Sequence, residues 1–91
     1  MSEIQIISIR YWASARSAAG TDAETLQIDN PITLTEVISR LGLAHPGSRL
    51  VEVLEVCSVL LGDLPVSSED PDDVLVPPGS TLEFLPPFAG G

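Results

Sequence analysis

The sequence predicts a small α+β fold in which one main amphipathic helix packs across a mixed β-sheet. Its 91 residues, 44% of them hydrophobic, are enough for one domain with one core. Strand-like and helix-like patterns follow in the order strand, short helix, strand, long helix, then two or three strands. One helix laid on one sheet buries these faces economically in so short a chain.

The first third of the chain predicts two strands separated by a short helix. Residues 3–12 are rich in β-branched and aromatic side chains, which are typical of a strand. Residues 13–19 are small and alanine-rich, and Gly20 follows them, as expected for a short helix closed by glycine. Residues 25–28 alternate between polar and apolar and predict the second strand, which the Asp-Asn-Pro sequence at 29–31 ends.

The main helix begins at a capping signal. Thr33 is the expected N-cap, and Glu36 stands three residues later, which is the spacing of a capping box. Gly42 is the expected C-terminal stop. The apolar residues between them recur on one helical face, at Leu34, Val37, Ile38 and Leu41.

A second helical stretch is expected after the turn at 44–47. Ser48 is its expected cap. The same apolar spacing then repeats at Leu50, Val53, Leu54 and Cys57.

The last third of the chain predicts strands joined by tight turns. Residues 56–61 form the first of these strands, and Gly62-Asp63 is the turn after it. Residues 64–66 are a short edge strand, because Pro65 has no N–H to give to a ladder. An acidic loop (67–73), a turn (77–80) and the last strand (81–85), which Pro86 ends, complete the domain.

This order of elements is that of a β-grasp fold. The first and last strands would pair in parallel at the sheet centre, and the helix would supply the long crossover that a parallel pair needs. We expect residues 1–85 to form the β-grasp domain and residues 86–91 to form a flexible tail.

The charge of the chain excludes several classes of partner. Thirteen acidic residues face four arginines and no lysine, which gives a formal charge of −9. Nucleic acids and anionic membranes are therefore unfavourable partners, whereas a basic protein is a favourable one. The simpler interpretation is that the acidic surface maintains solubility. The chain has no long apolar run and no basic signal-peptide head, so we expect a cytoplasmic protein.

The chain contains one cysteine, Cys57, and one histidine, His45. One cysteine makes no internal disulfide, and this pair has no metal-ligand spacing. We expect Cys57 to be a buried core residue and predict no metal site.

The most informative segment is the last one, Leu85-Pro86-Pro87-Phe88-Ala89-Gly90-Gly91. The two prolines favour an extended direction, and the two glycines allow the backbone to approach closely inside a narrow site. A narrow, extended segment of this kind suits insertion into the active site of another protein. We therefore hypothesise that the carboxylate of Gly91 is the chemically active group.

Two motifs together resemble a known family. Tyr11-Trp12-Ala13, followed by Arg16 and Ala19-Gly20, resembles the Tyr-Phe-Ala…Arg…Gly segment that opens the bacterial ubiquitin-like sulfur carriers of molybdopterin and thiamine synthesis. The tail resembles their Pro-Pro-small-small-Gly-Gly signature. Length, helix position and turn order are similar over the whole chain, most of all to the small subunits of molybdopterin synthase. Phe88 departs from the signature, as do the turns at 61–63 and 78–80 from their usual sequences.

The resemblance implies a role as a sulfur donor. An adenylyltransferase similar to ubiquitin-activating enzymes would adenylate Gly91 with ATP, and a sulfur donor would then convert it to a thiocarboxylate. The carrier would insert Gly90 and Gly91 into the large subunit of molybdopterin synthase. There the sulfur would pass to the pyranopterin precursor of the molybdenum cofactor. The chain would thus be a sulfur-donating subunit, not an enzyme alone, and would bind no cofactor itself.

The resemblance also implies docking residues. An apolar patch of Trp12, Leu64 and Leu85 would contact both partners, unless Trp12 and Leu85 are core or protected-edge residues. Arg16 matches a family arginine and would pair with an acidic residue of a partner or form a surface salt bridge. The tail contributes further contacts through Pro86, Pro87, Phe88 and Ala89.

Three other functions stay open at this point. A related carrier would deliver the same thiocarboxylate sulfur to cysteine or thiamine biosynthesis. A ubiquitin-like modifier would form isopeptide bonds with other proteins. An interaction domain would use its surface only, and its terminal glycines would be inert.

Overall fold

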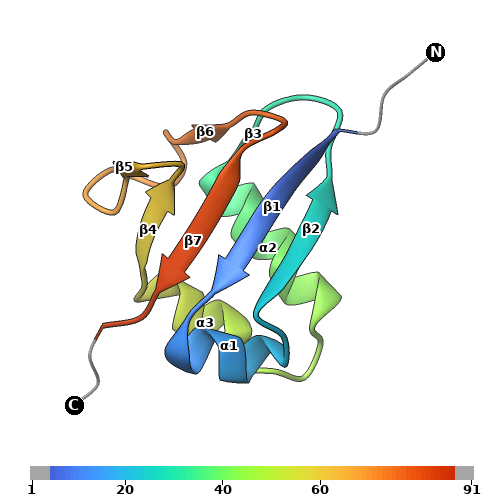
Figure 1. The fold of residues 1–91 in the computed structure, drawn as a ribbon, viewed down its shortest axis with the longest axis vertical. Helices are drawn as coiled ribbons and strands as arrows, with labels where there is room; N and C mark the ends of the chain where they lie inside the picture. Colours follow the sequence, from blue (N-terminus) through green and yellow to red (C-terminus); the bar gives the residue numbers. More distant parts are fainter. Residues whose placement is uncertain (1–4, 88–91) are drawn as a thin grey trace.

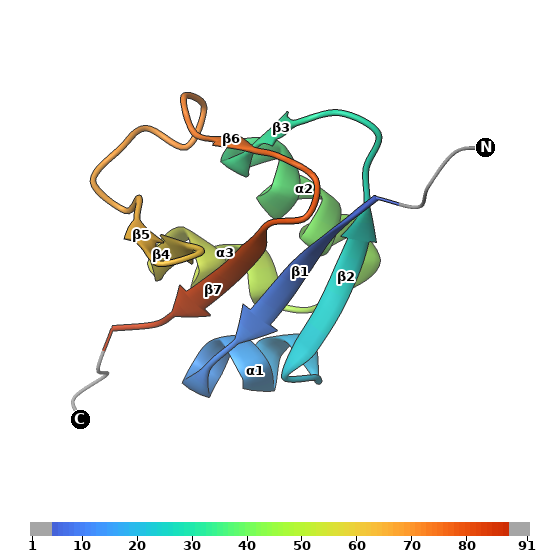
Figure 2. The same cartoon turned by 45° about the horizontal axis from the view of Figure 1, so that its top comes forward.

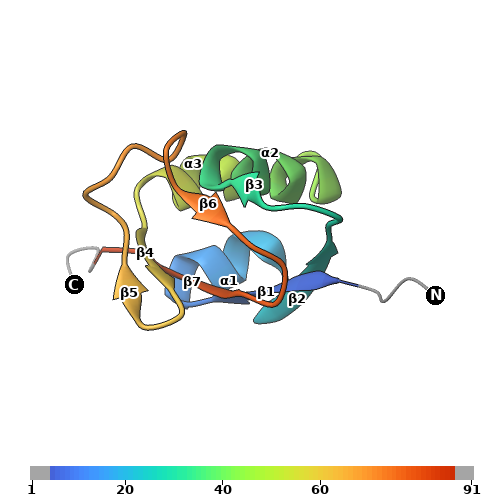
Figure 3. The ribbon, with the colours of Figure 1, turned by 90° about the horizontal axis from the view of Figure 1, so that it is seen from above.

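In the computed structural model, which describes residues 5–87, a five-stranded mixed sheet forms one layer of the molecule. Helices α2 (Leu34–Ala44) and α3 (Leu50–Glu55) lie across one face of this sheet (Figures 1 and 3). Helix α1 (Ala13–Ala19) lies at the end of the sheet where β1 finishes. The strands are β1 (Ile6–Tyr11), β2 (Ala23–Gln27), β3 (Ile32–Thr33), β4 (Ser58–Leu61), β5 (Leu64–Pro65), β6 (Leu75–Val76) and β7 (Thr81–Leu85).

The first and last strands of the chain are parallel neighbours in the middle of the main sheet. The strand order is β2-β1-β7-β4-β5, and every pair except β1·β7 is antiparallel. Ser8 lies opposite Thr81, and Tyr11 lies opposite Phe84. The predicted β-grasp arrangement is therefore confirmed, with the helices in the crossover between β1 and β7 and with β5 at the predicted edge.

The short strands β3 and β6 form a second sheet that the sequence analysis missed. Ile32 lies opposite Val76, and Thr33 lies opposite Leu75. This pair ties the segment before α2 to the segment before β7 (Figure 2). Strands β3 and β6 have only two residues each, which is too short to show the alternation that predicts a strand.

The predicted N-terminus of the main helix is confirmed. Thr33 is the N-cap of α2, and its Oγ1 accepts a hydrogen bond from the backbone N–H of Glu36 at 3.1 Å. The carboxylate of Glu36 accepts a bond from Nε of Arg40, one turn further along, at 3.0 Å.

The predicted C-terminus of the same helix is wrong. Helix α2 continues through Gly42 to Ala44 and ends at His45. A Cβ added to Gly42 would lie 2.4 Å from Cγ2 of Val51 on α3. The glycine therefore serves close packing of α2 against α3, which a local sequence pattern does not reveal.

Helix α1 ends at the expected glycine, whereas α3 does not begin at the expected cap. Gly20 adopts a left-handed conformation after α1, with φ of 76°, and its N–H donates to the carbonyl of Arg16 at 2.9 Å. The predicted cap of α3 is wrong by one residue: Arg49 is the N-cap and makes no side-chain capping bond, whereas Oγ of Ser48, one residue earlier, accepts a bond from the N–H of Leu50 at 3.2 Å.

The core lies between the sheet and the helices. Among residues 5–87, every buried residue is apolar, a tyrosine or a cysteine. The rings of Tyr11 and Phe84 stack with centroids 6.3 Å apart across the central pair of strands. Cys57 is buried, as predicted. The largest fully buried side chains are Phe84, Ile7, Ile9, Leu41, Leu50, Leu54, Leu82, Val37 and Val76. Within the described range, no helix is both long and apolar enough to cross a membrane.

The packing of Gly42 predicts that Gly42→Ala destabilises the native chain but stabilises a chain that carries Val51→Ala. In the native chain, Gly42→Ala forces a methyl group against Val51, and such overpacking costs about 1–3 kcal/mol. Alanine regains about 1 kcal/mol of helix propensity, so the net loss of stability should be about 1 kcal/mol. In a Val51→Ala background, the same substitution should instead stabilise by about 1 kcal/mol. Urea unfolding of the four chains measures both differences, and stabilisation by Gly42→Ala in the native background would contradict the packing argument.

Candidate functional site

The two central strands finish side by side where the chain leaves the sheet (Figures 1 and 2). Strand β7 ends at Leu85, and the N–H of Trp12 donates to the carbonyl of Phe84 at 3.2 Å, which extends the pairing beyond β1. Proline has no N–H, so Pro86 makes no such bond and the ladder ends there. Trp12 therefore lies beside the start of the tail.

Trp12 and Leu85 belong to the sheet face that points away from α2 and α3. Side chains alternate between the two faces along a strand. The members of the central strands that face the helices are the buried ones, Ile7, Ile9 and Tyr11 in β1 and Leu82 and Phe84 in β7. The intervening residues, including Trp12 after β1 and Leu85 in β7, therefore point to the open face.

The strand register brings two further apolar residues to this part of the open face. Leu60 of β4 lies opposite Glu83, and Pro65 of β5 lies opposite Leu60. Residues directly opposite one another in an antiparallel pair share a face. We call Trp12, Leu60, Pro65 and Leu85 the open-face patch. The sequence analysis did not identify Leu60 or assign Pro65 to this patch, because their place depends on the register between strands.

The ring of Trp12 is exposed and held in place. Its Nε1 donates to Oε1 of Glu83 at 3.0 Å, and the guanidinium of Arg10 lies 5.7 Å from the ring centroid. The residue is nevertheless 44% exposed, which excludes a core role. A large aromatic side chain already fixed by its neighbours loses little entropy on binding, as is typical of residues that dominate interfaces.

Leu64 and Arg16 lie apart from the open-face patch. Leu64 is exposed, and it pairs with Leu61, which packs against the core on the helix-bearing side. By register, Leu64 therefore faces the opposite side of the sheet from Trp12. Arg16 is exposed in the last turn of α1, and no carboxylate of residues 5–87 lies within salt-bridge distance of it.

The predicted reactive end of the chain falls beyond the part that the structure describes. Phe88, Ala89, Gly90 and Gly91 lie outside residues 5–87, so their roles stay predictions. The described part of the tail is Pro86, which is half-buried, and Pro87, which is exposed.

Cys57 is unsuited to nucleophilic chemistry. Its thiol donates to the carbonyl of Val53 at 3.2 Å, and burial raises its pKa to about 11. The reactive form of a cysteine is the thiolate, which is scarce near neutral pH at such a pKa. This cysteine therefore serves packing.

His45 is engaged in a polar contact at the edge of the core. Its Nε2 lies 2.6 Å from Oε2 of Glu24, and the hydroxyl of Tyr11 donates to the same oxygen at 2.6 Å. Burial, with a smaller contribution from Glu24, raises the pKa of Tyr11 well above its usual range. Over residues 5–87, no group of three His, Cys, Asp or Glu side chains could hold a metal ion.

Comparison with known proteins establishes the family. A family model described as the ThiS family matches residues 9–91. This chain belongs to the ThiS family. The resemblance to the ubiquitin-like sulfur carriers is thereby confirmed.

Two curated relatives are similar over almost the whole length of this ThiS-family chain. A molybdopterin synthase sulfur carrier subunit from Aspergillus niger is 33% identical over 91 residues, which is 100% of each chain. A protein of the same name from Chlamydomonas reinhardtii is 25% identical over 85 residues, which is 93% of this chain and 98% of the relative.

Solved structures share the fold of this ThiS-family member. Small archaeal modifier protein 1 from Haloferax volcanii superposes with a TM-score of 0.75 at 19% identity, covering 94% of this chain and 99% of the other. Urm1 from Trypanosoma brucei superposes with a TM-score of 0.74 at 18% identity, covering 100% of both chains. A chain in a complex of subunits 1 and 2 of molybdopterin-converting factor from Helicobacter pylori superposes with a TM-score of 0.59 at 22% identity. The match covers 94% of this chain and 99% of the other. At these identities the likeness shows the ubiquitin-like β-grasp fold alone.

Proposed function

We propose that this chain is the sulfur-carrier subunit of a molybdopterin synthase and carries sulfur as a thiocarboxylate on Gly91. The observation that carries the proposal is the 33% identity, over the full length of both chains, to a relative named for that role. The arrangement of the sheet supports it, because the last strand is central and leads into Pro86 and Pro87 beside an exposed apolar patch.

The proposed chemistry activates a poor electrophile in two steps. An oxygen of the Gly91 carboxylate attacks the α-phosphorus of ATP, and pyrophosphate leaves. A donor at the oxidation level of sulfide then attacks the acyl carbon, so that a C–S bond forms while the C–O bond to AMP breaks. The resulting thiocarboxylate later transfers its sulfur to the pyranopterin precursor, and water attacks the acyl carbon as the C–S bond breaks, which restores the Gly91 carboxylate. ATP and the sulfur donor act through the activating enzyme, a partner of the ubiquitin-activating type.

The residues of the tail suit this route. Glycine has no Cβ, so Gly90 and Gly91 present the acyl carbon without crowding a narrow site. Pro86 and Pro87 restrict the backbone before insertion, which lowers the entropy that binding must remove. Phe88 requires a wider tunnel or a matching pocket in the partner.

We propose that the open-face patch docks on the large subunit. The Helicobacter pylori relative is a complex of two subunits of molybdopterin-converting factor, which is the kind of assembly that this role needs. Trp12, held by Glu83, would be the central anchor, with Leu85 beside it at the start of the tail. The activating enzyme would use the same surface at another time. Arg16 is exposed and is available to pair with an acidic residue of the partner at the rim of this interface.

The other functions differ in their acceptor. A carrier for cysteine or thiamine biosynthesis would form the same thiocarboxylate, and the family model alone does not separate it from the proposed role. A modifier would instead pass the activated acyl group to a lysine of another protein. The names of both curated relatives favour molybdopterin synthesis.

The role of Gly91 predicts loss of sulfur transfer from minimal changes. Deleting Gly91, or appending one alanine after it, should abolish conversion of the pyranopterin precursor by the carrier, its large subunit, the activating enzyme, ATP and a sulfide source. Circular dichroism should be unchanged, because the core lies within residues 5–87. An alanine inserted between Met1 and Ser2 is the matched control and should retain activity. Retained conversion in either tail variant would refute the role of the terminal carboxylate.

The docking proposal predicts a difference between two exposed apolar residues. Trp12→Ala should weaken binding to the large subunit by about 2 kcal/mol, because a fixed aromatic anchor is lost. Leu75→Ala, on the separate β3·β6 sheet, should have no effect, although Leu75 is also exposed. Isothermal titration calorimetry measures both affinities. Equal weakening by the two substitutions would contradict docking through the open face.

A further inference from the structure

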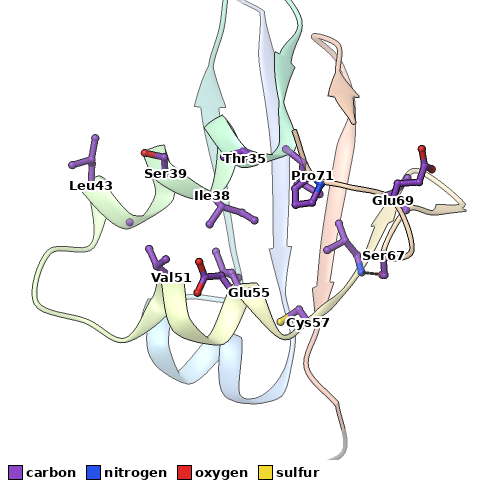
Figure 4. Close-up of a pocket in the computed structure, with 15 residues that line it drawn as sticks. Thr35, Ile38, Ser39, Leu43, Val51, Glu55, Cys57, Ser67, Glu69 and Pro71 are labelled. Carbon is purple, nitrogen blue, oxygen red and sulfur yellow. Dashed lines mark hydrogen bonds between the residues drawn. The ribbon is translucent and has the colours of Figure 1, made fainter. Parts of the chain in front are cut away.

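A groove on the helix-bearing side of the molecule has no role in the proposed sulfur transfer. It lies between α2, α3 and the loop after β5, and it encloses about 580 Å³ (Figure 4). Its apolar lining includes Ile38 and Leu43 of α2, Val51 of α3 and Pro71 of the loop. Leu43 is 79% exposed, the most of any large hydrophobic residue in the described range. The groove therefore offers an apolar surface that the fold itself does not cover.

One wall of the groove is fixed to the N-terminal end of α2. The backbone N–H of Leu34 donates to the carbonyl of Val74 at 2.9 Å, and that of Thr35 donates to the carbonyl of Pro71 at 3.3 Å. The hydroxyl of Thr35 also donates to the carboxylate of Asp72. The acidic loop predicted at 67–73 is present and its residues are exposed, and these bonds hold it against the helix. The groove is thus formed before any partner binds, which lowers the entropic cost of binding.

The charged residues that line the groove are all acidic. They are Glu55 on α3 and Glu69 on the loop, and no arginine of the described chain lines it. The same loop adds the exposed carboxylates of Asp70, Asp72 and Asp73. An apolar floor with an anionic rim is complementary to an amphipathic cationic segment, and rim charges of this kind steer encounter and fix orientation.

We propose that this groove binds a basic amphipathic helix of a partner protein. The apolar face of that helix would lie on Ile38, Leu43 and Val51. Its lysines or arginines would lie over Glu55 and Glu69. The groove and the open-face patch lie on opposite faces of the sheet, so both can be occupied at once. A protein bound in the groove could therefore retain the carrier while its open face and tail engage an enzyme.

A second copy of this chain is a poor occupant. Each copy carries a formal charge of −9 and has only four basic residues, all arginines. Bringing a second such surface to the acidic rim is opposed by repulsion. The favoured occupant is accordingly a cationic segment of another protein.

The test uses the whole protein and a defined probe, and it needs no sulfur chemistry. The probe is a helical peptide of about 14 residues, four turns, with leucines on one face and lysines on the other. Titration into ¹⁵N-labelled protein should shift amide signals of α2, α3 and the loop at 67–73, but not those around Trp12. A peptide with serine in place of leucine, and one with glutamate in place of lysine, should each bind at least about tenfold more weakly.

Matched variants separate the groove from general charge attraction. Leu43→Ser should weaken peptide binding about fivefold, and Leu75→Ser, at another exposed leucine that lies outside the groove, should not. The double variant Glu55→Gln and Glu69→Gln should weaken peptide binding about fivefold at low salt. The pair Asp22→Asn and Asp63→Asn removes the same charge elsewhere and should change it less than twofold. Equal effects of the two charge pairs, equal binding of the serine peptide, or signal shifts centred on Trp12 would each overturn the proposal.

Discussion

The parallel ladder between β1 and β7 joins the two ends of the chain, and the rest of the fold is arranged around it. Ile9 lies opposite Leu82, and both are fully buried beneath the helices. A parallel pair needs a crossover connection, and here the intervening chain supplies all three helices and the outer strands. The same ladder determines where the chain leaves the sheet, beside Trp12. Loss of this pairing would therefore remove the core and the docking surface together.

The sequence predicted those features that depend on neighbours in the chain. Thr33 caps α2, Gly20 closes α1, and the last strand runs over residues 81–85, all as expected. Gly42 was misread because its role depends on Val51, which belongs to another helix. The same limit applies to the proposed docking residues, since the register between strands decides which face of the sheet each one occupies. Trp12 and Leu85 share the open face, whereas Leu64 pairs with Leu61 toward the other side.

The two surfaces of the molecule differ in chemistry in a way that suits a carrier. The open-face patch is apolar, and the side chains of Glu83 and Arg10 lie against the ring of its Trp12. The groove between α2 and α3 has an acidic rim without a lining arginine. Under the proposed function, the carrier leaves its activating enzyme before it meets its acceptor, so the two partners would occupy the open-face patch at different times. A chemically distinct second surface would let another protein remain bound throughout that exchange.

The proposed carrier role depends on conversion of the terminal carboxylate of Gly91 to a thiocarboxylate. The most direct test is the intact mass of the protein after incubation with its activating enzyme, ATP and a sulfide source, followed by fragmentation to locate the change. We expect a mass increase equal to the replacement of one oxygen by one sulfur, located at Gly91, and no increase when ATP is omitted. An unchanged mass with an activating enzyme that is active on another carrier, or sulfur located at Cys57, would contradict this role.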